Sequence, residues 1–252
     1  MLIDAHAHLH FDRTISDIDN IIKRAKQNNV SYILNSGTDM EGNKKTLELS
    51  KKYDIIKPSF GLYPVHASNL SEKDFQKELD FIKQNKKNIW LIGEVGLDFK
   101  EDKNFKKQKE TFQKIIELTE KLNLPILIHS RKAEQECIEI LETSKIKNII
   151  MHCFSGKFRL VKRITDNNWY FSIPTIITRL LHFQKIVEET NISNLLTETD
   201  TPYLSPYFGK TNEPSFITET IKKISEIKKL DKEETEKIIF TNFQKIFLKN
   251  KK

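Results

Sequence analysis

Short apolar runs recur along the whole chain and alternate with polar segments whose apolar residues lie three and four positions apart. The spacing of three and four predicts amphipathic helices between the runs, which themselves are typical of buried strands. Strands that alternate with helices form parallel sheets through right-handed crossovers. We predict strands at residues 2–9, 32–36, 55–62, 89–97, 125–129, 148–154, 169–173 and 195–200. Eight such units in 252 residues predict an α/β fold, a (β/α)₈ TIM barrel, as a single domain over residues 1–252.

A doubly wound open sheet is the alternative fold for the same alternation of strands and helices. Within the third predicted strand, Pro58 lacks the N–H of a ladder hydrogen bond, so we expect that strand to begin at Ser59. Ser16 and Ser71 are each followed three residues later by aspartate, a pattern typical of a capping box. Prolines and a glycine at 202–214 predict a long loop before the last helical region.

The composition is that of a globular protein, with 38% hydrophobic and 31% charged residues. The net charge of +7 favours anionic partners such as nucleic acid, although lysines spread over helix exteriors also fit an ordinary solvated surface. Two isolated cysteines do not form a disulfide framework, and the first residues lack a targeting pattern. No run approaches the ~20 residues of a membrane span. We therefore expect a cytoplasmic protein that does not associate with a membrane and needs no obligate protein partner.

Four of the seven histidines and two carboxylates fall at the carboxyl ends of predicted strands, where barrel enzymes have their active sites. His6 and His8 lie two apart on a strand, so both rings point to the same side. Alone, such a pair also fits two hydrogen-bonded structural histidines. The remaining candidates occur in the segments 93–98, 128–131, 152–156 and 198–202.

Divalent cations account for this set of side chains as a whole. An unpaired buried charge costs several kcal/mol, whereas a bound cation compensates imidazoles and carboxylates together. Four imidazoles and two carboxylates exceed the three protein ligands usual for one catalytic zinc. We therefore predict two adjacent metal ions that share a carboxylate.

With these motifs the chain resembles the TatD family of metal-dependent deoxyribonucleases, in the amidohydrolase-like barrel superfamily, over essentially its full length. The resemblance is carried by Asp4-Ala5-His6-Ala7-His8, Gly93-Glu94-Val95-Gly96-Leu97-Asp98, His129-Ser130-Arg131-Lys132-Ala133, His152-Cys153-Phe154-Ser155-Gly156, Glu198-Thr199-Asp200-Thr201-Pro202-Tyr203 and Asn212-Glu213-Pro214. It implies that His6, His8, Glu94 and Asp200 hold one metal, and that Glu94, His129 and His152 hold the other. Glu94 would bridge the two.

The activity implied by this resemblance is hydrolysis of DNA phosphodiester bonds through a water activated by two metals, as an exonuclease on single-stranded ends. Asp200 would accept the proton of the water, and Asp200 and Glu94 are the expected catalytic residues. Mg²⁺ is the favoured ion, and Mn²⁺ and Zn²⁺ are compatible with the same ligands. Two alternatives remain: a metal-dependent deacylase or amidohydrolase acting on an ester or amide such as aminoacyl-tRNA, and a nucleic-acid-binding or scaffold protein with an inactive site.

Three further residues are candidates for binding substrate. Where the family usually has Gly-x-His-Pro, this chain has Gly61-Leu62-Tyr63-Pro64, so the phenol of Tyr63 replaces a histidine. His66 is a candidate substitute for that histidine. Arg131 can grip a phosphate with two parallel hydrogen bonds or form a structural ion pair.

The roles of several neighbouring residues stay open between function and packing. Asp98 either orients a ligand histidine or caps the following loop. Cys153 is expected to face away from the metals as a buried inert thiol, and His10 and His182 are expected at the surface. Four aromatic residues are candidates for stacking on bases or for packing: Phe99, Tyr203, Tyr207 and Phe208.

Overall fold

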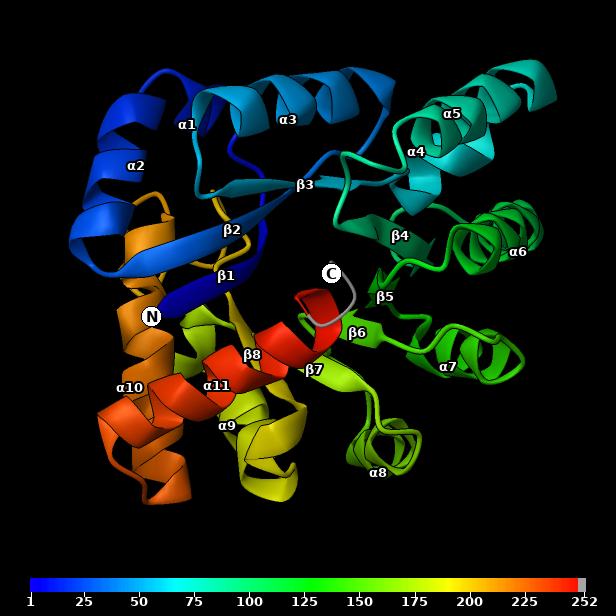
Figure 1. The fold of residues 1–252 in the computed structure, drawn as a ribbon. Helices are drawn as coiled ribbons and strands as arrows, with labels where there is room; N and C mark the ends of the chain where they lie inside the picture. The colour runs from blue at the N-terminus through cyan, green and yellow to red at the C-terminus, as the bar shows by residue number, and fades with distance from the viewer. Residues whose placement is uncertain (249–252) are drawn as a thin grey trace.

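The computed structural model describes residues 1–248, which form one barrel of eight parallel strands in chain order. The strands are β1 (Leu2–Ala7), β2 (Val30–Ser36), β3 (Ile56–Phe60), β4 (Leu91–Asp98), β5 (Ile126–Arg131), β6 (Ile149–His152), β7 (Tyr170–Pro174) and β8 (Leu195–Glu198). Figure 1 shows them around a common centre with the helices outside. The predicted (β/α)₈ barrel is confirmed, and the open sheet is wrong. Residues 249–252 of the predicted domain lie outside the described part.

Helices follow each strand, as the alternating pattern predicts. They are α1 (Asp12–Ile15), α2 (Ile18–Gln27), α3 (Met40–Lys52), α4 (Pro64–Asn69), α5 (Glu72–Gln84), α6 (Phe105–Leu122), α7 (Glu134–Glu142), α8 (Phe158–Asp166), α9 (Leu181–Glu189), α10 (Ile217–Lys228) and α11 (Lys232–Phe247). Short 3₁₀ turns occur at η1 (Thr175–Thr178), η2 (Ile192–Asn194) and η3 (Pro214–Phe216).

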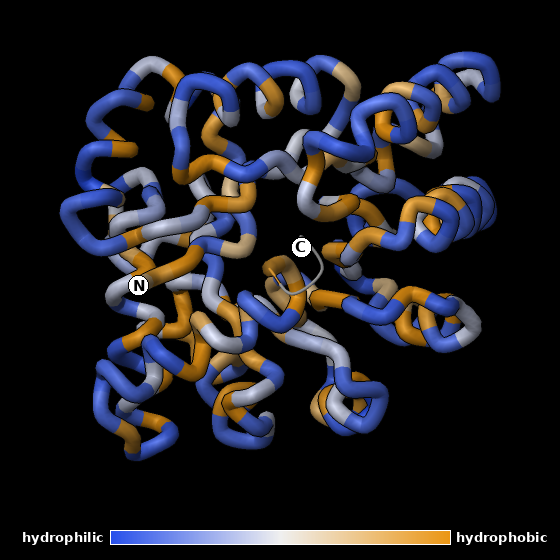
Figure 2. Tube along the Cα trace, viewed as in Figure 1, coloured by the Kyte–Doolittle hydropathy of each residue, from blue (hydrophilic) through white to orange (hydrophobic). Residues whose placement is uncertain are grey.

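The helices turn their apolar residues toward the strands. In α2, Ile18, Ile21, Ile22 and Ala25 are buried, and this spacing places them on one helical face. Figure 2 shows the same arrangement around the barrel, with hydrophobic stretches on the inside and hydrophilic ones on the outer faces. In the part of the chain that the structure describes, none of the helices has the length and apolarity that a membrane crossing needs.

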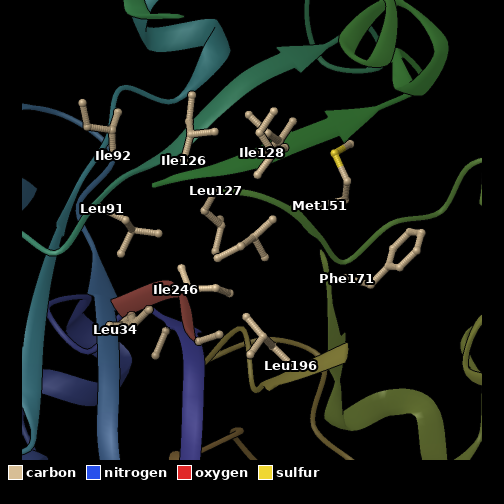
Figure 3. Packing of buried hydrophobic residues seen from close by; sticks show 14 of the residues in the cluster. Leu34, Leu91, Ile92, Ile126, Leu127, Ile128, Met151, Phe171, Leu196 and Ile246 are labelled. Carbon is tan, nitrogen blue, oxygen red and sulfur yellow. The ribbon is translucent and has the colours of Figure 1, made fainter. Parts of the chain in front are cut away.

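The end of the barrel where the strands begin is covered by α11. Ile246 is 1% exposed and lies among Leu34, Leu127 and Leu196 from three strands (Figure 3). Phe243 of the same helix packs against Tyr32, at the start of β2, with ring centroids 5.0 Å apart. Burial of an aliphatic side chain such as that of Ile246 contributes about 1.5–3 kcal/mol to the free energy of unfolding. Because α11 occupies this end, the opposite, carboxyl end of the strands is the open one.

Closure of the barrel joins β1 to the segment that follows β8. The amide of Asp200 donates to the carbonyl of His6 at 2.9 Å, and the amide of His8 donates to the carbonyl of Thr201 at 2.7 Å. Residues Ala7 and Thr201 form a parallel bridge at this seam. The first histidine pair and Asp200 are therefore held side by side by backbone hydrogen bonds.

A buried aspartate strengthens this seam. Asp4 is fully buried, and its carboxylate accepts hydrogen bonds from the amide of Thr199 at 2.9 Å and from the Thr199 hydroxyl at 2.6 Å. Burial raises the pKa of Asp4 to about 7, although the Thr199 hydrogen bonds act in the opposite direction. The sequence motif around His6 contains Asp4, but only the fold reveals that its partner is Thr199, the residue that follows β8.

Two local predictions are wrong. Strand β3 begins at Ile56 and contains Pro58, whose carbonyl accepts a hydrogen bond from the amide of Trp90 at 2.8 Å. The nitrogen of Pro58 faces β4, as its carbonyl does. Because residue pairing between β3 and β4 begins only at Ser59, the missing N–H of Pro58 removes no hydrogen bond from the ladder. Ser16 does not cap a helix, because α2 begins after Asp17. Ser71 caps α5 as predicted, accepting from the amide of Asp74.

Candidate metal centre

The six predicted ligands converge at the open end of the barrel. His6, Glu94, His129 and His152 lie on β1, β4, β5 and β6, while His8 and Asp200 directly follow β1 and β8. Five of the six line one pocket of about 720 Å³, and His6 lies behind them, fully buried. The rings of His6 and His8 are 4.6 Å apart, so both point to the same side as the strand alternation predicts.

The carboxylate of Glu94 is at the centre of the four imidazoles. Its Oε2 lies 3.3 Å from His129 Nδ1, 3.7 Å from His152 Nε2 and 3.9 Å from His6 Nε2. Its Oε1 lies 3.4 Å from His8 Nε2. The two oxygens of this one carboxylate therefore face different imidazoles, and Glu94 belongs to two of the groups of side chains that could hold a metal ion.

Asp200 faces the first two histidines. Its Oδ1 lies 3.4 Å from His6 Nε2 and 3.7 Å from His8 Nε2. Asp200 has a φ of +59°, a left-handed conformation that aspartate tolerates better than most residues. Strand β8 has ended at this point, so the turn of the chain directs the carboxylate into the pocket.

These residues fit divalent cations. Ligand atoms within 4.8 Å of one another form three groups: His6 with His152 and Asp200, His6 with His8 and Glu94, and Glu94 with His129 and His152. Ligands bound about 2.1 Å from one tetrahedral ion lie about 3.4 Å from each other, close to the separations around Glu94. Moreover, His6 Nε2 is buried and has no hydrogen-bond partner among residues 1–248. A bound cation would supply that partner.

Each of the first two imidazoles is oriented by β2. His6 Nδ1 lies 3.0 Å from the hydroxyl of Ser36, and His8 Nδ1 lies 2.8 Å from the Ser36 carbonyl. Both Nε2 atoms are thereby left to face Glu94 and Asp200. Such outer partners fix the ring orientation and the tautomer of metal-binding histidines. Ser36 is missed in the sequence, because nothing local indicates its register against β1.

His152 is oriented by a buried glutamate. Glu198 is fully buried, and its carboxylate accepts from His152 Nδ1 at 2.9 Å, from the amide of Cys153 at 3.0 Å and from the hydroxyl of Ser172. Burial lowers the pKa of His152, but Glu198 and the other carboxylates outweigh it and raise the value to about 10. The only signal for Glu198 in the sequence is its place two residues before Asp200.

His129 presents the other nitrogen to the site. Its Nε2 lies 3.0 Å from Asp98 Oδ2, so Nδ1 is the atom that faces Glu94. Asp98 is fully buried, accepts from the Tyr63 hydroxyl at 2.7 Å, and also accepts from the amides of Lys100 and Glu101 at 2.9 Å. Both roles considered for Asp98 are therefore present: it orients a ligand histidine and caps the loop.

The histidines and carboxylates of the cluster shift one another's pKa values. Burial acts to raise the pKa of Glu94, yet the surrounding histidines outweigh it and hold the value well below its ordinary range. Burial, with the neighbouring His152 and His8, lowers the pKa of His6 to about 4. His6 is thus neutral at physiological pH, the state in which an imidazole binds a metal.

A glycine permits β4 and β5 to approach beside the site. Gly96 has a φ of +142°, and a Cβ at this position would lie 2.0 Å from the carbonyl oxygen of His129. Gly96→Ala is expected to lower the free energy of unfolding by about 3 kcal/mol or more, because backbone strain and overlap with the backbone add together. Urea denaturation measures the loss.

The matched control is Gly209→Ala. Gly209 also has a positive φ, +71°, but apart from its two chain neighbours no described residue has an atom within 4 Å of its added Cβ. This variant should lose only about 1 kcal/mol. Equal losses for the two variants would contradict the role given to the close approach at Gly96.

All three predicted substrate-binding residues line the pocket, and each already has an acidic partner. Tyr63 donates to Asp98, Arg131 Nη1 donates to Glu101 at 3.2 Å, and His66 Nε2 lies 2.8 Å from Glu78. The ion pair considered for Arg131 is therefore present at the pocket rim.

Glu78 is 6% exposed and is not apparent as a site residue in the sequence. Its hydrogen bond raises the pKa of His66, because a carboxylate favours the charged imidazolium.

Other expectations are corrected. Cys153 has a φ of +42°, so the alternation of β6 does not extend to it, and it lines the pocket instead of facing away. His10 is only 5% exposed and lies beneath the start of α3, against Gly42. His182 is half-buried, with Nε2 3.2 Å from the Phe154 carbonyl.

Of the four aromatic candidates, Tyr203 lines the pocket. Phe99 packs on Phe105 and Tyr207 on Phe216, while Phe208 is 86% exposed with the Arg179 guanidinium over its ring.

A parallel barrel that gathers imidazoles and carboxylates at its carboxyl edge in metal-binding groups defines a metal-dependent hydrolase. The sequence model of the family described as TatD related DNase matches residues 3–248, and the chain belongs to this family. It is 38% identical over 245 residues to the uncharacterized metal-dependent hydrolase MJ1582 of Methanocaldococcus jannaschii, covering 97% of this chain and 96% of that protein. It is also 30% identical over 263 residues to the deoxyribonuclease TATDN3 of Homo sapiens, covering 98% and 95% of the two chains.

Solved structures agree on the fold. The crystal structure of YjjV, a TatD homolog from Escherichia coli K12, superposes with a TM-score of 0.90 at 22% identity and covers 98% of this chain and 97% of that one. At this identity the comparison supports the barrel alone.

Proposed function

We propose that this protein is a phosphodiesterase that depends on two divalent metal ions and hydrolyses DNA, as an exonuclease on single-stranded ends. The observation that carries the proposal is the position of the Glu94 carboxylate among four imidazoles, with Oε1 facing His8 and Oε2 lying 3.3–3.9 Å from His6, His129 and His152. The family membership and the deoxyribonuclease name of a relative at 30% identity support DNA as the substrate.

In this proposal six side chains bind the metal ions, and one of them also accepts a proton. His6, His8, Glu94 and Asp200 would hold one ion, and Glu94, His129 and His152 the other. Bound there, two divalent cations, with Mg²⁺ favoured, would supply charge that lowers the pKa of the attacking water and stabilises the phosphate oxygens. Asp200 would accept the proton of that water, since its carboxylate reaches the pocket from a backbone fixed to β1.

Substrate would be held by the residues at the rim. Arg131 can contact a phosphate if it exchanges Glu101 for the substrate, and His66, on α4, offers a second cationic group in the lining of the same pocket. Tyr63 already uses its hydroxyl proton in the hydrogen bond to Asp98, so it would act mainly by holding the His129 orientation. A pocket of about 720 Å³ accommodates a ligand of nucleotide size, which favours a free strand end over the interior of a duplex.

A product ladder tests the proposal. The protein loaded with Mg²⁺ is incubated with end-labelled single-stranded DNA, double-stranded DNA and RNA, and we expect single-nucleotide shortening of the single-stranded DNA. Rapid turnover of an aminoacyl ester without cleavage of DNA would favour the deacylase alternative. Binding of nucleic acid with no hydrolysis of either substrate would favour an inactive site. We also propose that the protein acts in the cytoplasm. The free thiols of Cys137 and Cys153 are consistent with a reducing compartment.

Salt provides a further prediction. Raising monovalent salt from about 50 to about 200 mM should lower kcat/KM for single-stranded DNA about tenfold, because two or three phosphate contacts release counterions on binding. The net charge of +7 does not suggest a larger contact area. Initial rates at several salt concentrations measure the slope, and an uncharged ester serves as the control. A salt-independent rate for DNA would count against phosphate recognition.

A further inference from the structure

The pocket of the metal centre continues into a second pocket of about 450 Å³. The two share four lining residues: Phe11, Thr38, Asp39 and Tyr203. Beyond this boundary the second pocket is bordered by α1 and by the first residues of α3, including Gly42 and Lys45. A ligand that fills the first pocket can therefore extend past Phe11 and Tyr203 into the second.

The ring of Tyr203 is available at this boundary. Tyr203 is 49% exposed, and its one ring neighbour among the described residues is Phe11, at 6.4 Å and an interplanar angle of 72°. This edge contact leaves the faces of the Tyr203 ring without a stacked aromatic partner. Phe11 differs, because its ring is stacked on His8 at 4.7 Å and 4°. At the boundary of the two pockets, Tyr203 therefore presents an aromatic face that no described ring covers, while one face of Phe11 is covered by His8.

The backbone of Tyr203 is fixed next to the metal centre. Its amide donates to the carbonyl of Asp200 at 2.8 Å, and its carbonyl accepts from Asn212 Nδ2 at 2.7 Å. Asn212 is fully buried and also donates to the carbonyl of Thr199 at 2.7 Å. The ring therefore extends from a rigid support three residues after Asp200, which reduces the entropy lost when a ligand stacks on it.

The charges of the second pocket indicate what kind of group it accepts. Arg13 and Lys45 line it, but so do Asp12, Asp39 and Glu41. Lys45 is paired with Glu41 at 2.8 Å. With acidic side chains in the majority, attraction for a phosphate is weak here. A flat, uncharged nucleobase fits an exposed aromatic face in such surroundings better than a phosphate does.

We propose that Tyr203 is a nucleobase-stacking site: the base adjacent to the scissile phosphate of a single DNA strand stacks on its ring, and the next nucleotide enters the second pocket. This inference rests on the proposed function and deepens it. A base can stack on Tyr203 only when it is released from a duplex, so the site accounts for a preference for single strands.

The test compares Tyr203→Ala, Tyr203→Phe and Tyr203→Leu in the full chain loaded with Mg²⁺. On oligothymidylate we expect Tyr203→Ala to raise KM about 5- to 150-fold, since base–aromatic stacking has this effect on affinity. Tyr203→Phe should stay within about twofold of the unaltered protein, because phenylalanine keeps the aromatic face. Tyr203→Leu should resemble Tyr203→Ala, because leucine is apolar but has no π-face. The metal content of each variant verifies that Asp200 is undisturbed.

A second substrate isolates the base. Two oligothymidylates are compared, each with a single abasic residue: in one it lies on the 5′ side of the cleaved linkage, and in the other it lies on the 3′ side. For the oligomer that lacks the stacked base, the unaltered protein and Tyr203→Ala should have equal KM values. The matched control is Tyr207→Ala, since Tyr207 is 39% exposed but lines neither pocket. Equal effects of Tyr203→Ala on normal and abasic oligomers, or equal effects of the Tyr203 and Tyr207 variants, would overturn the proposal.

Binding is measured separately from cleavage. Fluorescence anisotropy of labelled oligothymidylate, with Ca²⁺ in place of Mg²⁺, should give a weaker Kd for Tyr203→Ala by the same factor as KM. If the unaltered protein binds DNA through Tyr203 without cleaving it, the proposed nuclease function is wrong and the stacking site stands. If DNA is cleaved and neither KM nor Kd depends on Tyr203, the stacking site is wrong and the nuclease function stands.

Discussion

Replacing Asp200 with asparagine is expected to lower kcat on single-stranded DNA by a factor of about 10² to 10⁴, the usual effect of losing a general base. The loss can be larger, because the same carboxylate faces His6 and His8 at 3.4 and 3.7 Å and would also hold a metal. Initial rates at saturating DNA, with metal content measured on the same samples, separate the two contributions. Fold should be retained, since the Asp200 hydrogen bond in the barrel seam comes from its backbone amide.

Tyr63→Phe is the comparison for Asp200→Asn. The Tyr63 hydroxyl donates to Asp98 at 2.7 Å and has Glu101 Oε2 as a second, more distant acceptor at 3.4 Å. A hydrogen bond to a charged group is worth about 1.5–3 kcal/mol, so the loss should be at most about a hundredfold. If Tyr63→Phe proved as damaging as Asp200→Asn at normal metal content, the phenol would take part in proton transfer and Asp200 would not be the base.

Removal of metal is expected to abolish hydrolysis. Elemental analysis of protein equilibrated with Mg²⁺ or Mn²⁺ should give two ions per chain, and EDTA should reduce the rate to background until a divalent ion is restored. The reason is that the side chains assigned to the reaction, Asp200 and Glu94, lie within the groups that could hold a metal. Full activity with a single ion would remove the bridging role of Glu94.

Glu94→Gln tests that bridging role directly. An amide retains the size of the side chain but loses the charge that two cations would share, so we expect at least one ion to be lost together with the activity. Glu134→Gln is the matched control, because Glu134 lies outside the groups of ligands and outside the pocket lining. Retention of two ions and normal activity by Glu94→Gln would show that another group joins the metals.

Much of the site could be predicted because its signals are local. Strand alternation places His6 and His8 on one side, and the order of strands and helices places the carboxyl ends of all strands at one edge. His152 is the last residue of β6, whereas Glu94 and His129 lie within β4 and β5, and all three side chains reach the site near that edge.

The predictions that failed depend on conformations that no local pattern specifies. Cys153 leaves the strand alternation through a φ of +42°, and it lines the pocket as a result. His10 is buried because α3 packs over it, with Gly42 in contact. Pro58 is accepted within β3 because pairing with β4 starts only after it.

The sequence by itself determined the barrel through its periodicity, and its short motifs, through their resemblance to the TatD family, indicated the six candidate ligands, since both signals are properties of short segments. Only the tertiary structure decided which groups orient those ligands: Ser36 for His6 and His8, Glu198 for His152, and Asp98 with Tyr63 for His129. Most of these partners are far apart along the chain, and a change of one residue in the register between strands would separate them. Their positions follow from the closing of the barrel, in which β2 to β7 are each paired with two neighbours and β1 is joined to the segment that follows β8.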